Sequence, residues 1–208
     1  MKMNFIENIY ICLAAPLVIA VFCLNRMGRP MVLFVLGGMT VCLLSSYIST
    51  FLAAVYQIDL MTASITISPI VEECMKLLPI LYYLLVFEPD VRRLPACVIL
   101  VAMGFATFEN ACYLVQNDTM QFTNLLIRGF GTGAMHVVCG TFIFIGFSLF
   151  WDKAWLRAAG TVGLLAVAVT YHGIYNMLVL QSGAIATIGY LIPLLSTILI
   201  FILSSKEK

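Results

Sequence analysis

The chain has 208 residues, of which 62% are hydrophobic and only 10% charged, with a formal net charge of +1. Soluble domains carry about 25% charged residues, so this composition excludes a soluble enzyme, and the balanced charge excludes a nucleic-acid-binding protein. A mean hydropathy of +1.06 also excludes a disordered chain. We therefore expect a multi-pass protein of the lipid bilayer.

Seven apolar stretches are long enough to cross a bilayer core of about 30 Å, which takes about 20 residues of helix. Charged residues and turn formers separate them. In chain order they cover about Phe5–Leu24, Met31–Tyr56, Ala63–Phe87, Leu94–Val115, Leu125–Trp151, Trp155–Leu180 and Ala184–Leu203. The connections are too short for a second fold. We predict an all-α polytopic membrane helix bundle of about seven transmembrane helices, forming a single domain over residues 1–208.

The basic residues predict the orientation of the bundle, because cytoplasmic loops of membrane proteins are enriched in Lys and Arg. Eight of the eleven lie in the first, third and fifth connections and in the C-terminal tail: Arg26, Arg29, Arg92, Arg93, Lys153, Arg157, Lys206 and Lys208. We predict an outside N-terminus and a cytoplasmic C-terminus. Arg128, at the outer edge of the fifth stretch, is expected to meet lipid headgroups.

Four charged residues and both histidines lie inside apolar stretches: Glu72, Glu73, Lys76, Glu109, His136 and His172. A charge at the bilayer centre costs about 2.5–3.5 kcal/mol on insertion scales, so such residues pair, protonate or line a wet cavity. Their presence indicates a functional site.

The depth of these residues predicts that they share one site. Counted at 1.5 Å per residue from the outer ends of the stretches, the two adjacent glutamates lie about 14 Å deep, Glu109 about 9 Å, His136 about 16 Å and His172 about 12 Å. Four separate helices thus bring polar residues to one layer in the outer half of the membrane.

Helical spacing adds two expectations. Glu72 and Lys76 are four residues apart, so we expect an ion pair between them, with Glu73 turned away from Lys76. His172 and Asn176 share a face in the same way.

Carboxylates and imidazoles in a wet cavity suit the activation of water, in one of two arrangements. In the first, Glu109, His136 and His172 bind Zn²⁺, with Glu72 or Glu73 as general base. In the second no metal takes part: a glutamate deprotonates water, a histidine assists, and Asn176 or His172 stabilises the oxyanion.

The same residues form ordered motifs. Glu72-Glu73-Cys74-Met75-Lys76 matches EExxK, Phe105 to Glu109 matches FxxxE and is followed by Asn110, His136 stands alone, and His172 to Asn176 matches HxxxN. In this order they resemble the PrsW family of intramembrane proteases, which is similar to the CAAX-prenyl endopeptidase and bacteriocin-processing (Abi, CPBP) group. The motif-bearing core covers about residues 64–180. Many PrsW proteins have Asp where this chain has Asn176, whereas the prenyl-endopeptidase relatives use Asn.

The resemblance implies an intramembrane endopeptidase in the cell membrane, expected to be a bacterial cytoplasmic membrane. Its substrate would be a single-span membrane protein, such as an anti-sigma factor, cut near the extracytoplasmic boundary. By position, Glu72 is the catalytic base and Glu73 its supporting carboxylate, and Glu109, His136, His172 and Asn176 complete the catalytic residues. Lys76, Phe105 and Asn110 are supporting residues. The resemblance leaves a glutamic-type mechanism and a zinc mechanism open.

Two other functions fit the same residues. A proton-coupled transporter would use the glutamates and histidines as a relay, although no inverted repeat is evident in the sequence. A membrane scaffold would keep the polar residues for helix association alone, at only about 0.6 kcal/mol per pair.

Overall fold

The computed structural model describes residues 6–87, 94–116, 121–149 and 154–205. These residues form seven helices and no strand, which confirms the all-α prediction. The helices are α1 (Ile6–Cys23), α2 (Gly28–Tyr56), α3 (Leu60–Phe87), α4 (Leu94–Gln116), α5 (Phe122–Leu149), α6 (Ala154–Val179) and α7 (Ala184–Ser205).

Six of the helices described are long and apolar enough to cross a membrane, and α3 is the exception. It has 28 residues, but Glu72, Glu73 and Lys76 stand within little more than one turn at its middle. The protein is therefore a polytopic membrane bundle, and α3 is the helix that carries three charged residues at its middle.

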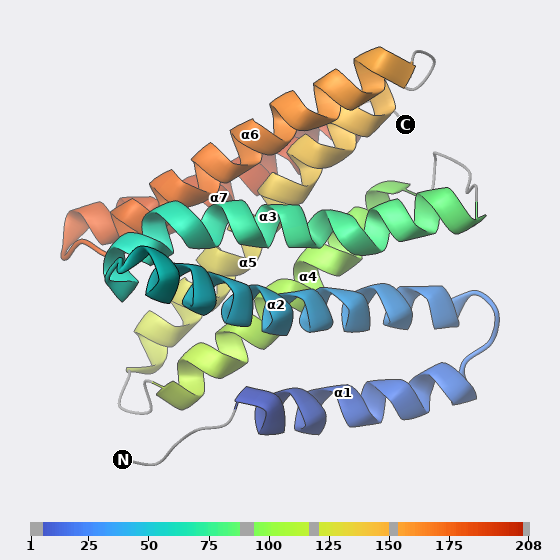
Figure 1. Ribbon diagram of the computed structural model, residues 1–208, viewed down its shortest axis with the longest axis horizontal. Coiled ribbons are helices and arrows are strands. Elements are labelled where there is room, and N and C mark those ends of the chain that lie inside the picture. Colours follow the sequence, from blue (N-terminus) through green and yellow to red (C-terminus); the bar gives the residue numbers. More distant parts are fainter. Residues whose placement is uncertain (1–5, 88–93, 117–120, 150–153, 206–208) are drawn as a thin grey trace.

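Consecutive helices run in opposite directions, as Figure 1 shows. Helix α1 lies at one flank, packed on α2 and α4, and α7 packs on α5 and α6 at the other. Helices α2, α3, α4 and α5 fill the space between them. The ends of α2, α4 and α6 therefore lie at the same end of the bundle as the start of α3.

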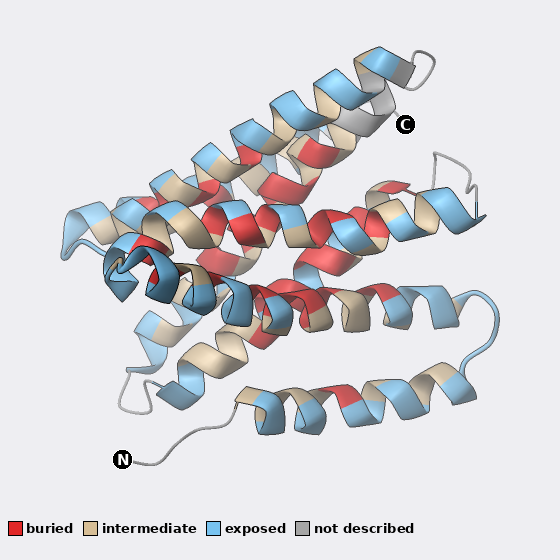
Figure 2. Cartoon of the chain, viewed as in Figure 1, coloured by how far each residue is buried: buried red, intermediate tan, exposed pale blue. Residues whose placement is uncertain are grey.

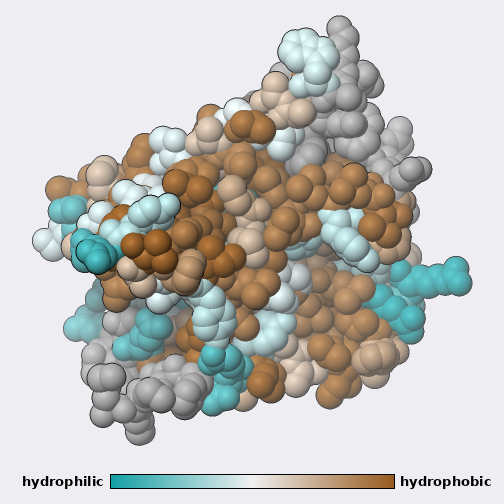
Figure 3. Space-filling model, viewed as in Figure 1, coloured by the Kyte–Doolittle hydropathy of each residue, from teal (hydrophilic) through white to brown (hydrophobic). Residues whose placement is uncertain are grey.

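Burial and hydropathy divide the bundle into an interior and a lipid-facing belt. The buried residues gather where the central helices face one another (Figure 2). Many large hydrophobic side chains are instead exposed, among them Ile19, Phe51, Leu85 and Phe201. Hydrophobic residues cover most of the face seen in Figure 3, and the hydrophilic ones lie mainly toward its margins. An exposed apolar belt of this kind fits a bilayer.

Helices α2 and α4 touch through their backbones at two glycines. A Cβ atom on Gly38 would lie 2.1 Å from the carbonyl oxygen of Val101, and one on Gly104 would lie 2.1 Å from that of Val35. Only glycine permits so close a crossing, a device common between membrane helices. The crossing fixes α4 against α2 just over one turn before Glu109.

Helix α6 approaches α3 closely at a proline. Pro69 has no N–H to donate to the carbonyl of Ile65, one turn earlier in α3. A Cβ atom on Gly173 would lie only 3.1 Å from that carbonyl oxygen. The small residue lets α6 rest on this part of α3, and the neighbouring His172 consequently faces α3.

Asp59 determines where α3 begins. Its Oδ1 accepts a 3.0 Å hydrogen bond from the backbone N–H of Thr62, and its Oδ2 accepts one of 2.6 Å from the Thr62 hydroxyl. These hydrogen bonds lower the pKa of the Asp59 carboxyl. A capping aspartate satisfies the free N–H groups of a helix start, so α3 begins at Leu60 rather than near Ala63 as predicted.

Candidate active site

The charged residues and histidines inside the apolar segments meet at the centre of the bundle. Glu73, Lys76, His136 and His172 are each at most 2% exposed. They come from α3, α5 and α6, and α4 adds Glu109 through a hydrogen bond to His136. Depth along the helices correctly predicted that these residues lie together.

Glu73 joins α3 to α6. Its Oε1 accepts hydrogen bonds from Lys76 Nζ at 2.6 Å and from His172 Nδ1 at 2.7 Å. Because a carboxylate only accepts, the proton of neutral His172 lies on Nδ1. The Nε2 atom of His172 is then left with a free lone pair, and it lies 3.7 Å from Glu72 Oε2.

The prediction of an ion pair between Glu72 and Lys76 is wrong. Lys76 pairs instead with Glu73, three residues away. Both spacings bring two side chains to the same face of a helix. The same Lys76 ammonium also lies 2.7 Å from His136 Nδ1 on α5, a contact that spacing within α3 could not predict.

His136 has a partner at each ring nitrogen. Lys76 donates to Nδ1, so the imidazole proton lies on Nε2 and is donated to Glu109 Oε2 at 2.6 Å. The Phe105 ring lies 4.9 Å from the imidazole, and the Lys76 ammonium lies 4.6 Å from the centre of that ring. Phe105, predicted as a supporting residue, therefore packs against two members of the cluster.

Arg128 belongs to the site, although the sequence led us to expect it among lipid headgroups. Its guanidinium lies 3.3 Å from Glu109 Oε1, donates to Asn110 Oδ1, and lies 3.4 Å above the Tyr113 ring. Asn110 Nδ2 in turn donates to the Gly129 carbonyl at 3.3 Å. The expectation failed because α5 begins at Phe122, which places Arg128 nearly two turns inside the helix.

Glu72 and Glu109 are the two carboxylates of the cluster that face open space. The Glu72 side chain is 17% exposed, and it lines a cavity of about 420 Å³ between α2, α3 and α4. The buried Oε2 has no hydrogen-bond partner among the residues described. A buried carboxylate oxygen without a partner is costly, and at a cavity wall it indicates a place for water, a ligand or a cation.

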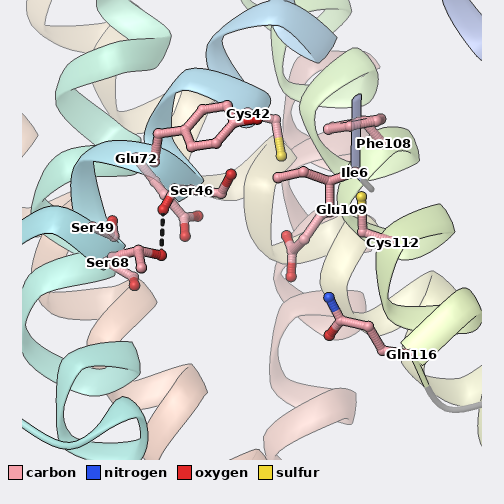
Figure 4. A pocket seen from close by; sticks show the side chains of 12 residues that line it. Ile6, Cys42, Ser46, Ser49, Ser68, Glu72, Phe108, Glu109, Cys112 and Gln116 are labelled. Carbon is pink, nitrogen blue, oxygen red and sulfur yellow. Dashed lines mark hydrogen bonds between the residues drawn. The ribbon is translucent and has the colours of Figure 1, made fainter. Parts of the chain in front are cut away.

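Glu109 lines the same cavity from α4, opposite Glu72 (Figure 4). The remaining lining residues are Ile6 of α1, six residues of α2 and α3, and three of α4: Cys42, Ser46, Tyr47, Ser49, Thr50, Ser68, Phe108, Cys112 and Gln116. Hydroxyl groups are frequent on the α2 side. The sequence patterns did not single out these residues, because serine and threonine are ordinary in membrane helices.

Asn176 holds a different position from the other predicted site residues. Its Nδ2 donates a 2.8 Å hydrogen bond to the Ser64 carbonyl, eight residues before Glu72 in α3. This bond fastens α6 to α3, and the structure does not bring the Asn176 amide into contact with the glutamates or histidines. Its role as an oxyanion donor stays a prediction.

Glu72, His136 and His172 are the residues that could hold a metal ion, although His136 would first have to give up one of its two hydrogen bonds, to Lys76 or to Glu109. One oxygen or nitrogen of each lies within 4.8 Å of the others, among the residues that the structure describes. With neutral imidazoles, three carboxylates face only two cations, Lys76 and Arg128. The unpartnered Glu72 oxygen and this excess of negative charge both fit a cation. The set contains Glu72 where the sequence predicted Glu109, which is hydrogen-bonded to His136.

The chain matches the model of a known protein family. The model of a family described as PrsW family intramembrane metalloprotease matches residues 29–204, which include every residue of the cluster. No curated protein and no solved structure matches the chain. Helix α1 lies outside the matched region.

Proposed function

The chain belongs to the PrsW family of intramembrane metalloproteases, and from this premise we propose that it is an endopeptidase in which Glu72 activates the attacking water. Family membership supports a membrane peptidase. The observation that carries the role of Glu72 is that it lines the cavity while its buried Oε2 has no hydrogen-bond partner among the residues described; Glu73 Oε2 is unpartnered too, but Glu73 does not line the cavity.

Glu72 and His172 can bind one water between them. Glu72 Oε2 and His172 Nε2 lie 3.7 Å apart, too far for a direct hydrogen bond, and both are acceptors in the arrangement above. A water that donates one hydrogen bond to Glu72 Oε2 and one to His172 Nε2 keeps its oxygen lone pairs free. One of these lone pairs can attack the carbonyl carbon of a peptide bond held in the cavity. Glu72 takes a proton from this water as it attacks, and the proton then passes to the leaving amine.

Glu73 is a positioning residue in this proposal. It is fully buried and touches Lys76 and His172 rather than the cavity. By accepting the Nδ1 proton of His172, it keeps the Nε2 lone pair directed at Glu72. Lys76 neutralises the charge of Glu73 within the same helix.

Glu109, His136 and Arg128 form the opposite side of the site. Arg128 compensates the charge of Glu109, and His136 joins Glu109 to Lys76. If zinc is bound, Glu72, His136 and His172 would hold it, and it would supply Lewis-acid activation of the water. Glu109 would then be the remaining carboxylate at the cavity, and it would take the proton in place of its hydrogen bond from His136 or Arg128.

We propose that the substrate is a single-span membrane protein, of the anti-sigma-factor kind, cut near the extracytoplasmic boundary. Glu109 and His172 each lie seven residues before the end of their helices, about 10 Å along the axis. These ends lie opposite the α1–α2 connection, which carries Arg26 and is followed by Arg29 in the first turn of α2. The basic connection favours the cytoplasm, so the site belongs to the outer half of the bilayer, in the cytoplasmic membrane of a bacterium.

The experiment is cleavage of a tagged single-span reporter co-expressed with the protein, followed by immunoblot. Glu72→Gln is expected to reduce cleavage by at least 100-fold, because general-base catalysis contributes about 10²- to 10⁴-fold. Asp59→Asn is the matched control, since it neutralises a carboxylate at the start of the same helix, outside the cluster.

Cleavage by Glu72→Gln at the rate of the unchanged protein, at equal expression, contradicts the proposal. A protein that cleaves no reporter but drives proton uptake into liposomes, with uptake abolished in Glu109→Gln, would instead favour a proton-coupled transporter.

A further inference from the structure

Ser49 on α2 has a buried hydroxyl without a partner. The residue is 7% exposed, it lines the cavity together with Glu72, and its Oγ makes no hydrogen bond to any residue described. Figure 4 shows Ser49 on the same side of the cavity as Ser46, Ser68 and Glu72, across from Glu109.

Other hydroxyls of α2 are satisfied within the helix. Ser45 donates to the Val41 carbonyl at 2.6 Å, Ser46 to that of Leu43 at 2.7 Å, and Thr50 to that of Ser46 at 2.7 Å. Back-bonding to the preceding turn is the usual solution for Ser and Thr in membrane helices. Ser49 departs from it: its hydroxyl has no partner among the residues described, in a residue that lines the cavity.

The charged donors of the site are already engaged. Lys76 donates to Glu73 and His136, and Arg128 to Glu109 and Asn110. The Asn176 amide donates to the Ser64 carbonyl. Because Lys76 and Arg128 are held by these partners, a neutral hydroxyl on the cavity wall is a further donor for a substrate carbonyl beside Glu72.

A membrane-spanning substrate brings such carbonyls when its helix unwinds. A helical peptide bond is enclosed by its own side chains and hydrogen bonds, so cleavage requires a locally extended stretch. Each main-chain group released inside a bilayer costs several kcal/mol unless the protein supplies a partner.

We infer that Ser49 donates a hydrogen bond to a main-chain carbonyl of an unwound substrate stretch held in the cavity between α2, α3 and α4. The inference rests on the proposed function and names what that site recognises: extended backbone in a membrane-spanning peptide, rather than a particular side chain. Ser46 and Thr50 have used their protons, so their lone pairs can accept from substrate N–H groups in the same cavity.

The test measures binding, so it does not depend on turnover. Glu72→Gln protein in detergent is titrated into a fluorescein-labelled single-span peptide with a Gly-Pro pair at mid-membrane, and into a matched peptide that has Leu-Ala there. Gly and Pro loosen the helix of the first peptide. We expect tighter binding of the Gly-Pro peptide, and Ser49→Ala should weaken it about fivefold to tenfold, the value of one hydrogen bond.

Ser49→Thr retains the hydroxyl and should bind more tightly than Ser49→Ala. Ser45→Ala is the matched control, because Ser45 is buried on the same helix, has its own partner and does not line the cavity. Ser49→Ala is also expected to fold at least as stably as the unchanged protein, because it removes an unsatisfied polar group.

Equal affinity of the Ser49→Ala protein for the Gly-Pro peptide would overturn the inference, as would equal binding of the two peptides. The proposed function is tested separately, by the reporter assay, and it fails if the Glu72→Gln protein still cleaves the reporter. A Ser49→Ala protein that binds normally, while Glu72→Gln abolishes cleavage, would remove the inference alone.

Discussion

His172 Nδ1 on α6 donates a 2.7 Å hydrogen bond to Glu73 Oε1 on α3, across 99 residues of sequence. Both side chains are almost fully buried. The bond determines which imidazole nitrogen carries the proton and therefore which one faces Glu72. Two adjacent glutamates thus have separate tasks: Glu73 orients the histidine, and Glu72 meets the cavity.

Replacing Glu73 tests this division. Glu73→Gln leaves the Lys76 ammonium buried without its carboxylate, so the free energy of unfolding should fall by about 3–5 kcal/mol. Denaturation of the purified protein in mixed micelles measures this free energy of unfolding. The double variant Glu73→Gln with Lys76→Met removes both charges and should regain at least half of the lost stability, but not the activity. A Glu73→Gln protein as stable as the unchanged one would show that the pair is not required.

Arg128 is expected to matter for catalysis more than for folding. It contacts Glu109, Asn110 and the Tyr113 ring at once. Arg128→Gln should lower kcat/KM on a reporter peptide about 10- to 100-fold through misplacement of Glu109. Arg128→Lys should restore little, since an ammonium cannot match the planar contacts of a guanidinium. Arg26→Gln, in the exposed α1–α2 connection, serves as the control; an equal loss there would refute a specific role.

The glycine crossing of α2 and α4 predicts a stability defect. Gly104→Ala would place a Cβ atom 2.1 Å from the Val35 carbonyl oxygen, so the helices must separate. We expect a loss of about 1–3 kcal/mol, typical of overpacking, with a lower thermal midpoint in detergent. Gly163→Ala is the matched control, because its Cβ would meet nothing within 4 Å. A midpoint unchanged in Gly104→Ala would contradict the close crossing.

Metal content can be measured directly on the purified protein by mass spectrometry. A zinc mechanism predicts that zinc binds to Glu72, His136 and His172, whose donor atoms lie within 4.8 Å of one another. His172→Ala should then lose bound zinc, with an affinity at least 100-fold weaker, whereas Asn176→Ala should retain it. Full activity of metal-free protein after chelation would exclude a zinc mechanism.

The sequence predicted the helices and the convergence of the site well, for a simple physical reason. The length of an apolar stretch and the count of residues from its end depend on the chain alone, so Glu72, Glu109, His136 and His172 could be assigned to one layer. The ends of most helices lie within about three residues of the predicted ones, as expected for boundaries.

The pairing within that layer could not be predicted, because it depends on the rotation of each helix about its axis. Spacing along α3 allows Lys76 to pair with either Glu72 or Glu73. Its additional contact with His136 on α5 depends on how the two helices face each other, which the sequence does not show. Arg128 was misjudged because three extra residues at the start of α5 changed its depth. Ser49 stands out only once the partners of its neighbours are known.

The three charges of α3 also bear on how this helix enters the membrane. Left unpaired they would cost about 7–10 kcal/mol during insertion. The ion pair between Glu73 and Lys76 is local, three residues apart, so it forms as soon as this part of the chain coils. His172 is made 99 residues later. Helix α3 thus contains the counter-ion of Glu73 from the start of membrane insertion. Among its three charged residues, only Glu72 has no partner until the later helices have packed.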